Sequence, residues 1–86
     1  MIFSWNEEKN ELLKITRNVS FEEAVLAINH SLLNVEKHNN IANQIIFVVI
    51  INNYVHRVPA VNEGNNNYFL KTIYADRKGH KKYLGG

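Results

Sequence analysis

An uninterrupted apolar run in the middle of the chain limits the possible folds more than any other feature. The seven residues Ile45 to Ile51 contain no polar side chain, which predicts a strand that is central in a sheet or buried on both faces. A membrane-spanning helix needs about 20 such residues, so we expect no membrane segment. Asn52 and Asn53 separate this run from a second strand-like segment, Tyr54 to Val61. Because asparagine accepts positive φ angles, the pattern predicts a tight β-hairpin.

A short strand and a helix are expected at the start of the chain. Ile2 to Trp5 alternates apolar and polar residues, and Asn6 then precedes two glutamates. Asparagine is a good N-cap residue, and acidic residues in the first turn suit the helix dipole. We therefore predict a helix of about ten residues that Asn18 ends in a left-handed conformation.

A second helix is expected directly afterwards. Ser20 and Glu23 have the spacing of a capping box, in which each residue satisfies a backbone amide of the other. The apolar residues that follow recur on one side of a helix, so this helix should pack on a sheet. The predicted apolar stripe is Phe21, Ala24, Val25, Ile28 and Leu32.

The end of the chain predicts one more strand and a basic helix. Pro59 lacks an amide hydrogen and marks an edge, a bulge or the end of pairing in its strand. Tyr68 to Tyr74 should form the last strand, and Asp76 should cap a helix from Arg77 to Leu84 that Gly79 weakens. The expected fold is one α+β domain, 1–86: a strand and two helices, then an antiparallel three-strand meander and a short basic helix.

Composition and charge narrow the possible functions. The chain has 86 residues and no cysteine, which excludes thiol chemistry, iron–sulfur clusters and cysteine zinc sites. The histidines, at positions 30, 38, 56 and 80, lack the spacing of a zinc site, and no cofactor motif is present. Residues 1–63 carry five basic and seven acidic side chains, whereas residues 64–86 carry five basic side chains and one acidic. The basic end suits a phosphate chain or an acidic protein, or it is a solvated helix.

Two stretches of the sequence contain short motifs that are recognisable together. The motifs are Phe3-Ser4-Trp5-Asn6, Lys9-Asn10, Val19-Ser20-Phe21-Glu22-Glu23-Ala24, Phe69-Leu70-Lys71-Thr72-Ile73, Arg77-Lys78 and Lys81-Lys82-Tyr83. Through them, about the first 25 residues and the C-terminal end resemble BrnT-type toxins of bacterial type II toxin-antitoxin modules, which have a RelE-like fold. One departure is Thr16-Arg17-Asn18, where many members carry Lys-His-Gly.

The resemblance implies an endoribonuclease that cuts RNA without a metal or other cofactor and so arrests translation and growth. A cognate antitoxin protein would neutralise it, and the chain would meet operator DNA only through the antitoxin complex. The departure at Thr16-Arg17-Asn18 favours a different antitoxin class or a weaker catalyst, with Arg17 taking any role of the missing histidine. Two alternatives stay open: a non-catalytic binding module of the same fold, and a plain nucleic-acid-binding domain. Without a secretory signal at its start, the chain is expected in the cytoplasm.

Metal-free RNA cleavage needs a base for the 2′-hydroxyl, cations for the phosphorane and an acid for the leaving oxygen. The catalytic candidates are Lys71, expected in the middle of the last strand, Arg77, His56 and His80. His56 and Arg57 are neighbours in one strand and should point to opposite faces, so only one of them can face RNA. The RNA-binding candidates are Arg57, Lys78, Lys81, Lys82 and Tyr83.

Overall fold

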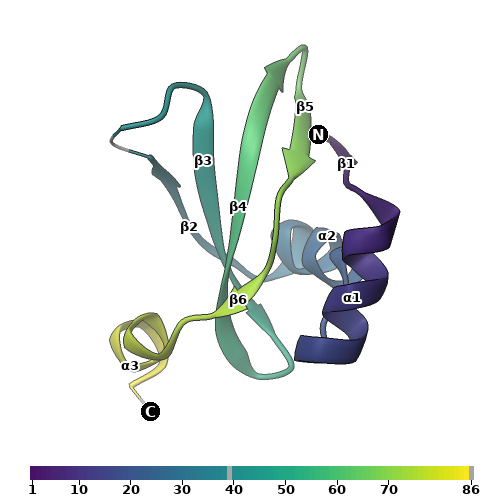
Figure 1. Ribbon diagram of the computed structural model, residues 1–86. Coiled ribbons are helices and arrows are strands. Elements are labelled where there is room, and N and C mark those ends of the chain that lie inside the picture. Colours follow the sequence, from purple (N-terminus) through teal and green to yellow (C-terminus); the bar gives the residue numbers. More distant parts are fainter. Residues whose placement is uncertain (39, 86) are drawn as a thin grey trace.

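A computed structural model describes residues 1–38 and 40–85, which form an α+β fold with a mixed sheet and three helices (Figure 1). The sheet order is β1-β5-β4-β3-β2, and β6 pairs with β4 beyond the end of β5. β1 runs parallel to β5, and every other pair is antiparallel. The elements are β1 (Ile2–Ser4), α1 (Glu7–Arg17), α2 (Phe21–His30), β2 (Leu32–Lys37), β3 (Gln44–Ile51), β4 (Tyr54–Gly64), β5 (Asn67–Leu70), β6 (Tyr74–Ala75) and α3 (Arg77–Leu84). None of the helices within the described residues is long and apolar enough to cross a membrane.

The predicted caps begin the first two helices and end the first one. The Asn6 side chain accepts a hydrogen bond from the Lys9 amide at 2.9 Å, and Asn18 ends α1 with φ 55°. Ser20 accepts from the Glu23 amide at 3.1 Å, and its hydroxyl donates to the Glu23 carboxylate. A short polar side chain therefore satisfies one free amide at each helix start, as the sequence predicted. The second half of the predicted capping box differs, because the Glu23 carboxylate bonds the Ser20 hydroxyl instead of the Ser20 backbone amide.

Helix α2 is shorter than its predicted apolar stripe. It ends at His30 because Ser31 leaves the helical region with φ −142°, and the Ser31 hydroxyl bonds both Ala27 and Ile50 carbonyls. The expectation that Leu32 extends the helical stripe is therefore wrong, since Leu32 begins β2. Because β2 pairs with the apolar strand β3, the predicted three-strand meander gains a fourth antiparallel strand at its edge.

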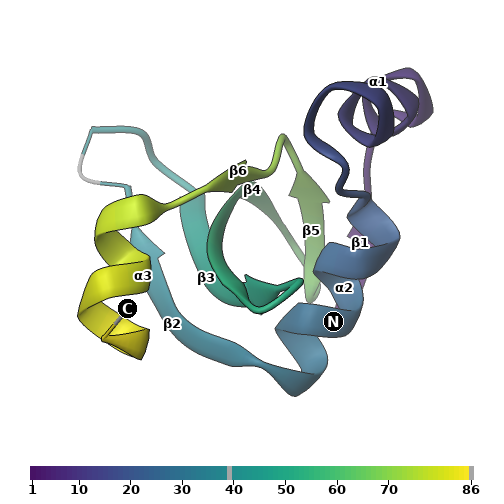
Figure 2. The same cartoon turned by 90° about the horizontal axis from the view of Figure 1, so that it is seen from below.

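Strand β3 is buried on both faces, which confirms the interpretation of the apolar run. On one face Phe47 and Val49 join the main core with residues of α1 and α2, and Phe21 there stacks on Trp5 at 5.6 Å. On the other face Val48 is fully buried. Figures 1 and 2 place α3 on the opposite side of the molecule from α1 and α2. The sheet is thus covered on both faces, with α3 alone on the second.

The predicted hairpin at Asn52 and Asn53 is confirmed, with φ angles of 52° and 62°. Asparagine occupies every non-glycine position with positive φ among the described residues, namely 18, 43, 52, 53, 65 and 66. Its short side chain tolerates the left-handed region better than that of most residues. The asparagines therefore act mainly as turn residues.

The last predicted strand is divided in two. The Lys71 amide donates to the Pro59 carbonyl at 2.8 Å, but Pro59 has no amide hydrogen to complete the pair. Pairing along β4 therefore stops at Leu70 and resumes with β6 at Tyr74. The expectation that Lys71 lies in the middle of a strand is wrong: it lies in the connection between β5 and β6.

Candidate functional site

Helix α3 is joined to β4 through Asp76 and Gly79. The Asp76 carboxylate accepts from the Gly79 amide at 3.0 Å, and the Asp76 amide donates to the Val55 carbonyl at 2.8 Å. A Cβ atom on Gly79 would overlap the Asp76 carboxylate and lie 3.2 Å from Val55 Cγ1. Glycine is thus the residue that lets α3 approach the sheet this closely, and its presence in a short helix has a packing reason.

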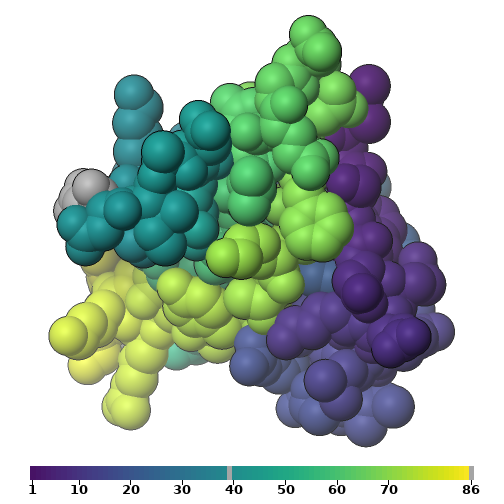
Figure 3. Space-filling model, turned by 45° about the horizontal axis from the view of Figure 1, so that its top comes forward, coloured from purple at the N-terminus to yellow at the C-terminus, as the bar shows by residue number. Residues whose placement is uncertain are grey.

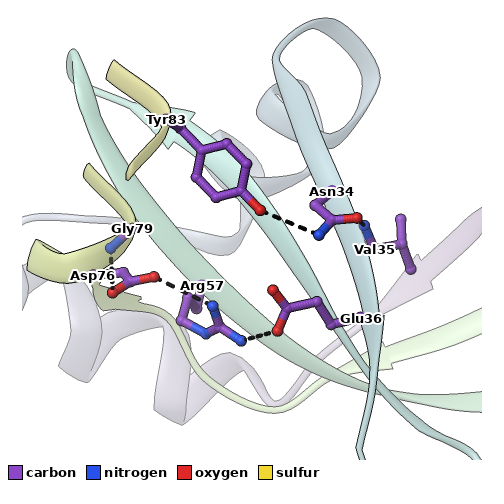
Figure 4. A network of polar contacts seen from close by, with 7 residues as sticks. All are labelled: Asn34, Val35, Glu36, Arg57, Asp76, Gly79 and Tyr83. Atoms are coloured by element: carbon purple, nitrogen blue, oxygen red, sulfur yellow. Dashed lines mark hydrogen bonds and ion pairs between the residues drawn. The ribbon is translucent and has the colours of Figure 1, made fainter. Parts of the chain in front are cut away.

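An ion network connects α3 to both β4 and β2 (Figure 4). The Arg57 guanidinium donates to Glu36 and, at 3.3 Å, to Asp76. Partial burial alone would lower the pKa of Arg57, but the hydrogen bonds to these two carboxylates outweigh it and raise that pKa above its ordinary value. Arg57 is therefore a cation held by two acidic groups.

The far end of α3 is joined to the edge strand. Tyr83 accepts a hydrogen bond at its hydroxyl from Asn34 of β2 at 3.1 Å, as Figure 4 also shows. The Lys82 ammonium lies 5.2 Å from the centre of the Tyr83 ring, within the range of a cation–π contact. Together, Asp76 and Tyr83 fix the two ends of the helix.

Four exposed basic residues extend from this fixed helix. They lie in two adjacent rows, each with a spacing of four residues, and make no ion pair with the residues that the structure describes. Figure 3 shows α3, in yellow, at a corner of the molecule with long side chains projecting from it. We call this surface the α3 cation face; it consists of Arg77, Lys78, Lys81 and Lys82.

The two candidate histidines have structural contacts. His80 Nδ1 accepts a hydrogen bond from the Val55 amide at 3.2 Å, and its ring stacks on Tyr54 at 4.0 Å. His56 is 8% exposed, and its Nδ1 lies 2.8 Å from the Tyr54 carbonyl oxygen. Both imidazoles thus meet at Tyr54, where each already has a partner.

Lys71 lies away from α3, in the connection between β5 and β6. Its ammonium is 3.4 Å from the side-chain oxygen of Gln44, which pairs with Val61, whereas the ion network is centred on Arg57 further along β4. Arg17 holds the same connection in place, because its guanidinium donates to the Ile73 carbonyl at 2.7 Å and to the Thr72 hydroxyl at 3.3 Å. The structure therefore gives Arg17 a definite contact with the segment that carries Lys71.

The predicted residues thus divide into two places. Sequence patterns did not indicate Glu36 and Asn34, because both lie on the strand that was missed. The residues near α3 are Arg57, Arg77, Lys78, His80, Lys81, Lys82 and Tyr83. Lys71 lies away from them, by Gln44, and His56 is buried in β4 beside Tyr54.

The sequence matches no model of a known protein family, and no curated protein matches it. The chemistry of the site must therefore be judged on its own geometry. A fixed helix with four exposed cations can neutralise phosphates or carboxylates, and the guanidinium of Arg77 can contact a phosphate through two hydrogen bonds.

Proposed function

We propose that this chain is the toxin of a bacterial type II toxin-antitoxin module and acts as a metal-independent endoribonuclease in the cytoplasm. The observation that carries the proposal is the α3 cation face: four exposed cations on a helix whose two ends are joined to the sheet. The resemblance of the first 25 residues and of the C-terminal segment to BrnT-type toxins supplies the activity.

RNA binding would depend mainly on this face. Each lysine or arginine that neutralises a phosphate releases a bound counterion, so the affinity should fall steeply as the salt concentration rises. Tyr83 lies beside Lys82, and an aromatic ring next to a cation is a common platform for a base. Because the helix is fixed before RNA binds, these contacts need little ordering on binding.

Catalysis is assigned to Arg77 and Lys71, which make no ion pair with the residues that the structure describes. In this assignment Arg77 stabilises the negative charge that develops on the phosphorane, and Lys71, which lies by Gln44 away from α3, contacts a neighbouring phosphate of the same RNA. His56 and His80 are weaker candidates than the sequence suggested, since His56 is 8% exposed and the bond from the Val55 amide to His80 Nδ1 puts the proton of a neutral His80 ring on Nε2. Arg17 acts through the backbone at Thr72 and Ile73, and so positions Lys71.

A cognate antitoxin is the expected protein partner. An acidic or amphipathic segment of the antitoxin would cover the α3 cation face and exclude RNA from it. Operator DNA would be bound only by the complex, through the antitoxin, and no membrane partner is proposed.

One observation favours a second candidate, a non-catalytic binding module of the same fold. His80 Nδ1 accepts from the Val55 amide, so the proton of its neutral ring is on Nε2 and this imidazole cannot act as a base while that bond holds. His56 is 8% exposed, so RNA has little access to its ring. Such a module would use the α3 cation face to bind its antitoxin but would not cut RNA.

Induced expression of the chain in a bacterial host, with growth and total RNA followed together, separates the two candidates. We expect arrest with RNA fragmentation, and loss of both when Lys71→Ala and Arg77→Ala are combined. The matched control combines Lys14→Ala and Lys37→Ala, which removes two exposed lysines away from α3 and should leave toxicity unchanged. Normal growth and intact RNA with folded wild-type protein would refute the ribonuclease and support the binding module.

A further inference from the structure

We propose that the groove between α3 and the sheet is a phosphate-binding site, and that Glu36 closes it in the free protein. The ligand would be one phosphate of a nucleic-acid backbone, which replaces the Glu36 carboxylate on Arg57. The inference deepens the proposed function and rests on it for the identity of the natural ligand, RNA.

The groove has the size and the charge for this ligand. Its volume is about 280 Å³, whereas a water molecule takes about 30 Å³ in the liquid, so a phosphate fits together with several waters. Three cations and two carboxylates surround it. The lining residues are Glu36, Arg57, Asp76, Lys78, Gly79, Lys82 and Tyr83.

The two carboxylates of the groove are held very differently. Asp76 is 15% exposed and bonds the Gly79 amide as well as Arg57, so its removal would uncap α3. Glu36 is 34% exposed on an edge strand, and Arg57 is the side-chain partner that the structure shows for it. Glu36 can therefore turn into solvent without breaking any other side-chain hydrogen bond or ion pair among the described residues.

Once Glu36 turns away, the groove becomes strongly cationic. Arg57 then has a free edge, and a guanidinium binds a phosphate in the same bidentate geometry as a carboxylate. Lys78 and Lys82 line the same space and pair with no carboxylate among the described residues. A phosphate would thus exchange one anionic partner of Arg57 for another and gain two further cations.

The test compares two variants that lose the same charge. Glu36→Gln removes the closing carboxylate but keeps a hydrogen-bond acceptor for Arg57, whereas Glu63→Gln neutralises an exposed glutamate outside the groove. Binding to a single-stranded RNA with 2′-O-methyl groups, which cannot be cleaved, is measured by fluorescence anisotropy. We expect Glu36→Gln to bind about fivefold more tightly than Glu63→Gln, as one unit charge near 4 Å in water implies. Equal affinities of the two variants would overturn the inference.

Two neighbouring lysines on α3 give a second matched comparison. In the Glu36→Gln background, Lys82→Gln should abolish the gain in affinity because Lys82 lines the groove. Lys81→Gln should lower the affinity for RNA whether residue 36 is Glu or Gln, because Lys81 belongs to the α3 cation face. The ratio of the two affinities should nevertheless persist, since Lys81 lies outside the lining. If the two lysine substitutions removed the gain in affinity equally, only the net charge of the helix would matter, and the proposed phosphate site in the groove would be refuted.

Titration with inorganic phosphate separates this inference from the proposed function. In the ¹⁵N spectrum, we expect the Gly79 and Lys82 amides and the Arg57 Nε–H group to shift at lower phosphate concentration in Glu36→Gln than in Glu63→Gln. Phosphate binding without any RNA binding would support the groove and refute the ribonuclease. RNA binding with equal phosphate titrations in the two variants would refute the groove and leave the ribonuclease standing.

Discussion

Replacing Gly79 by alanine should destabilise the domain, although the same change stabilises most helices. In a solvent-exposed helix interior, alanine is favoured over glycine by about 1 kcal/mol. Here the new Cβ would overlap the Asp76 carboxylate and crowd Val55. Asp76 would have to rotate, which breaks its bond to the helix start, worth about 1 kcal/mol, and its partly buried bond to Arg57, worth about 1.5–3 kcal/mol. The net expectation is a loss of about 1.5–3 kcal/mol in the free energy of unfolding.

Urea unfolding followed by circular dichroism measures this loss. Lys81→Ala, on the exposed side of the same helix, is the control and should change stability by less than about 0.5 kcal/mol. Because the cost passes through Asp76, the effect of Gly79→Ala should shrink in the background of Asp76→Ala, as a double-mutant cycle will show. If Gly79→Ala instead raised the stability by about 1 kcal/mol, as in an exposed helix, the close contact of α3 with β4 would be refuted.

Three further predictions concern other parts of the fold. Asn10→Ala should lower the free energy of unfolding by about 2–4 kcal/mol. The reason is that the fully buried Asn10 accepts from the Phe21 amide at 2.8 Å and donates to two glutamates. The control for this change is Asn29→Ala, at an exposed site on α2. The hydrogen bond from Asn10 lowers the pKa of Glu22. The ionised Glu22 carboxylate therefore stabilises the folded protein above the ordinary pKa of a glutamate, and this stabilisation is lost as the pH falls through the lowered pKa of Glu22. Stability measured from about pH 6 to pH 3 should therefore fall less in Glu22→Gln than in wild type. Asn53→Ala should cost about 1 kcal/mol in the same urea assay, since Asn53 has φ 62°, whereas Asn53→Gly should cost nothing; equal losses would argue against a left-handed turn.

The sequence predicted those parts of the fold that depend on local interactions. Asn6, Ser20 and Asp76 cap the three helices, and the caps are visible because each depends on residues three positions apart. The hairpin at Asn52 and Asn53 was equally local. In contrast, β2 was missed because its residues are mostly exposed on an edge, and only pairing with β3 makes them a strand.

The site was predicted by residue type but not by its contacts. The basic residues of α3 were found because they cluster near the end of the sequence. Residues 64–86 carry five basic side chains and one acidic, which indicates a cationic surface there. The roles of Glu36 and Arg17 depend on partners 21 and 56 residues away in the chain, which no local pattern reveals. Lys71 was misplaced because the break in the strand is caused by Pro59, a residue of the neighbouring strand.

The parallel pairing of β1 with β5 has a consequence for how the protein is made. Ser4 pairs with Phe69, so the first strand has no partner until nearly the whole chain has been synthesised. Closing so long a loop carries an entropic cost, and sheets built from distant segments fold slowly. Meanwhile the aromatic ring of Phe3, which finally packs against Tyr68 and Phe47, remains open to solvent on the nascent chain. β1 can therefore join the sheet only after β5 has been synthesised.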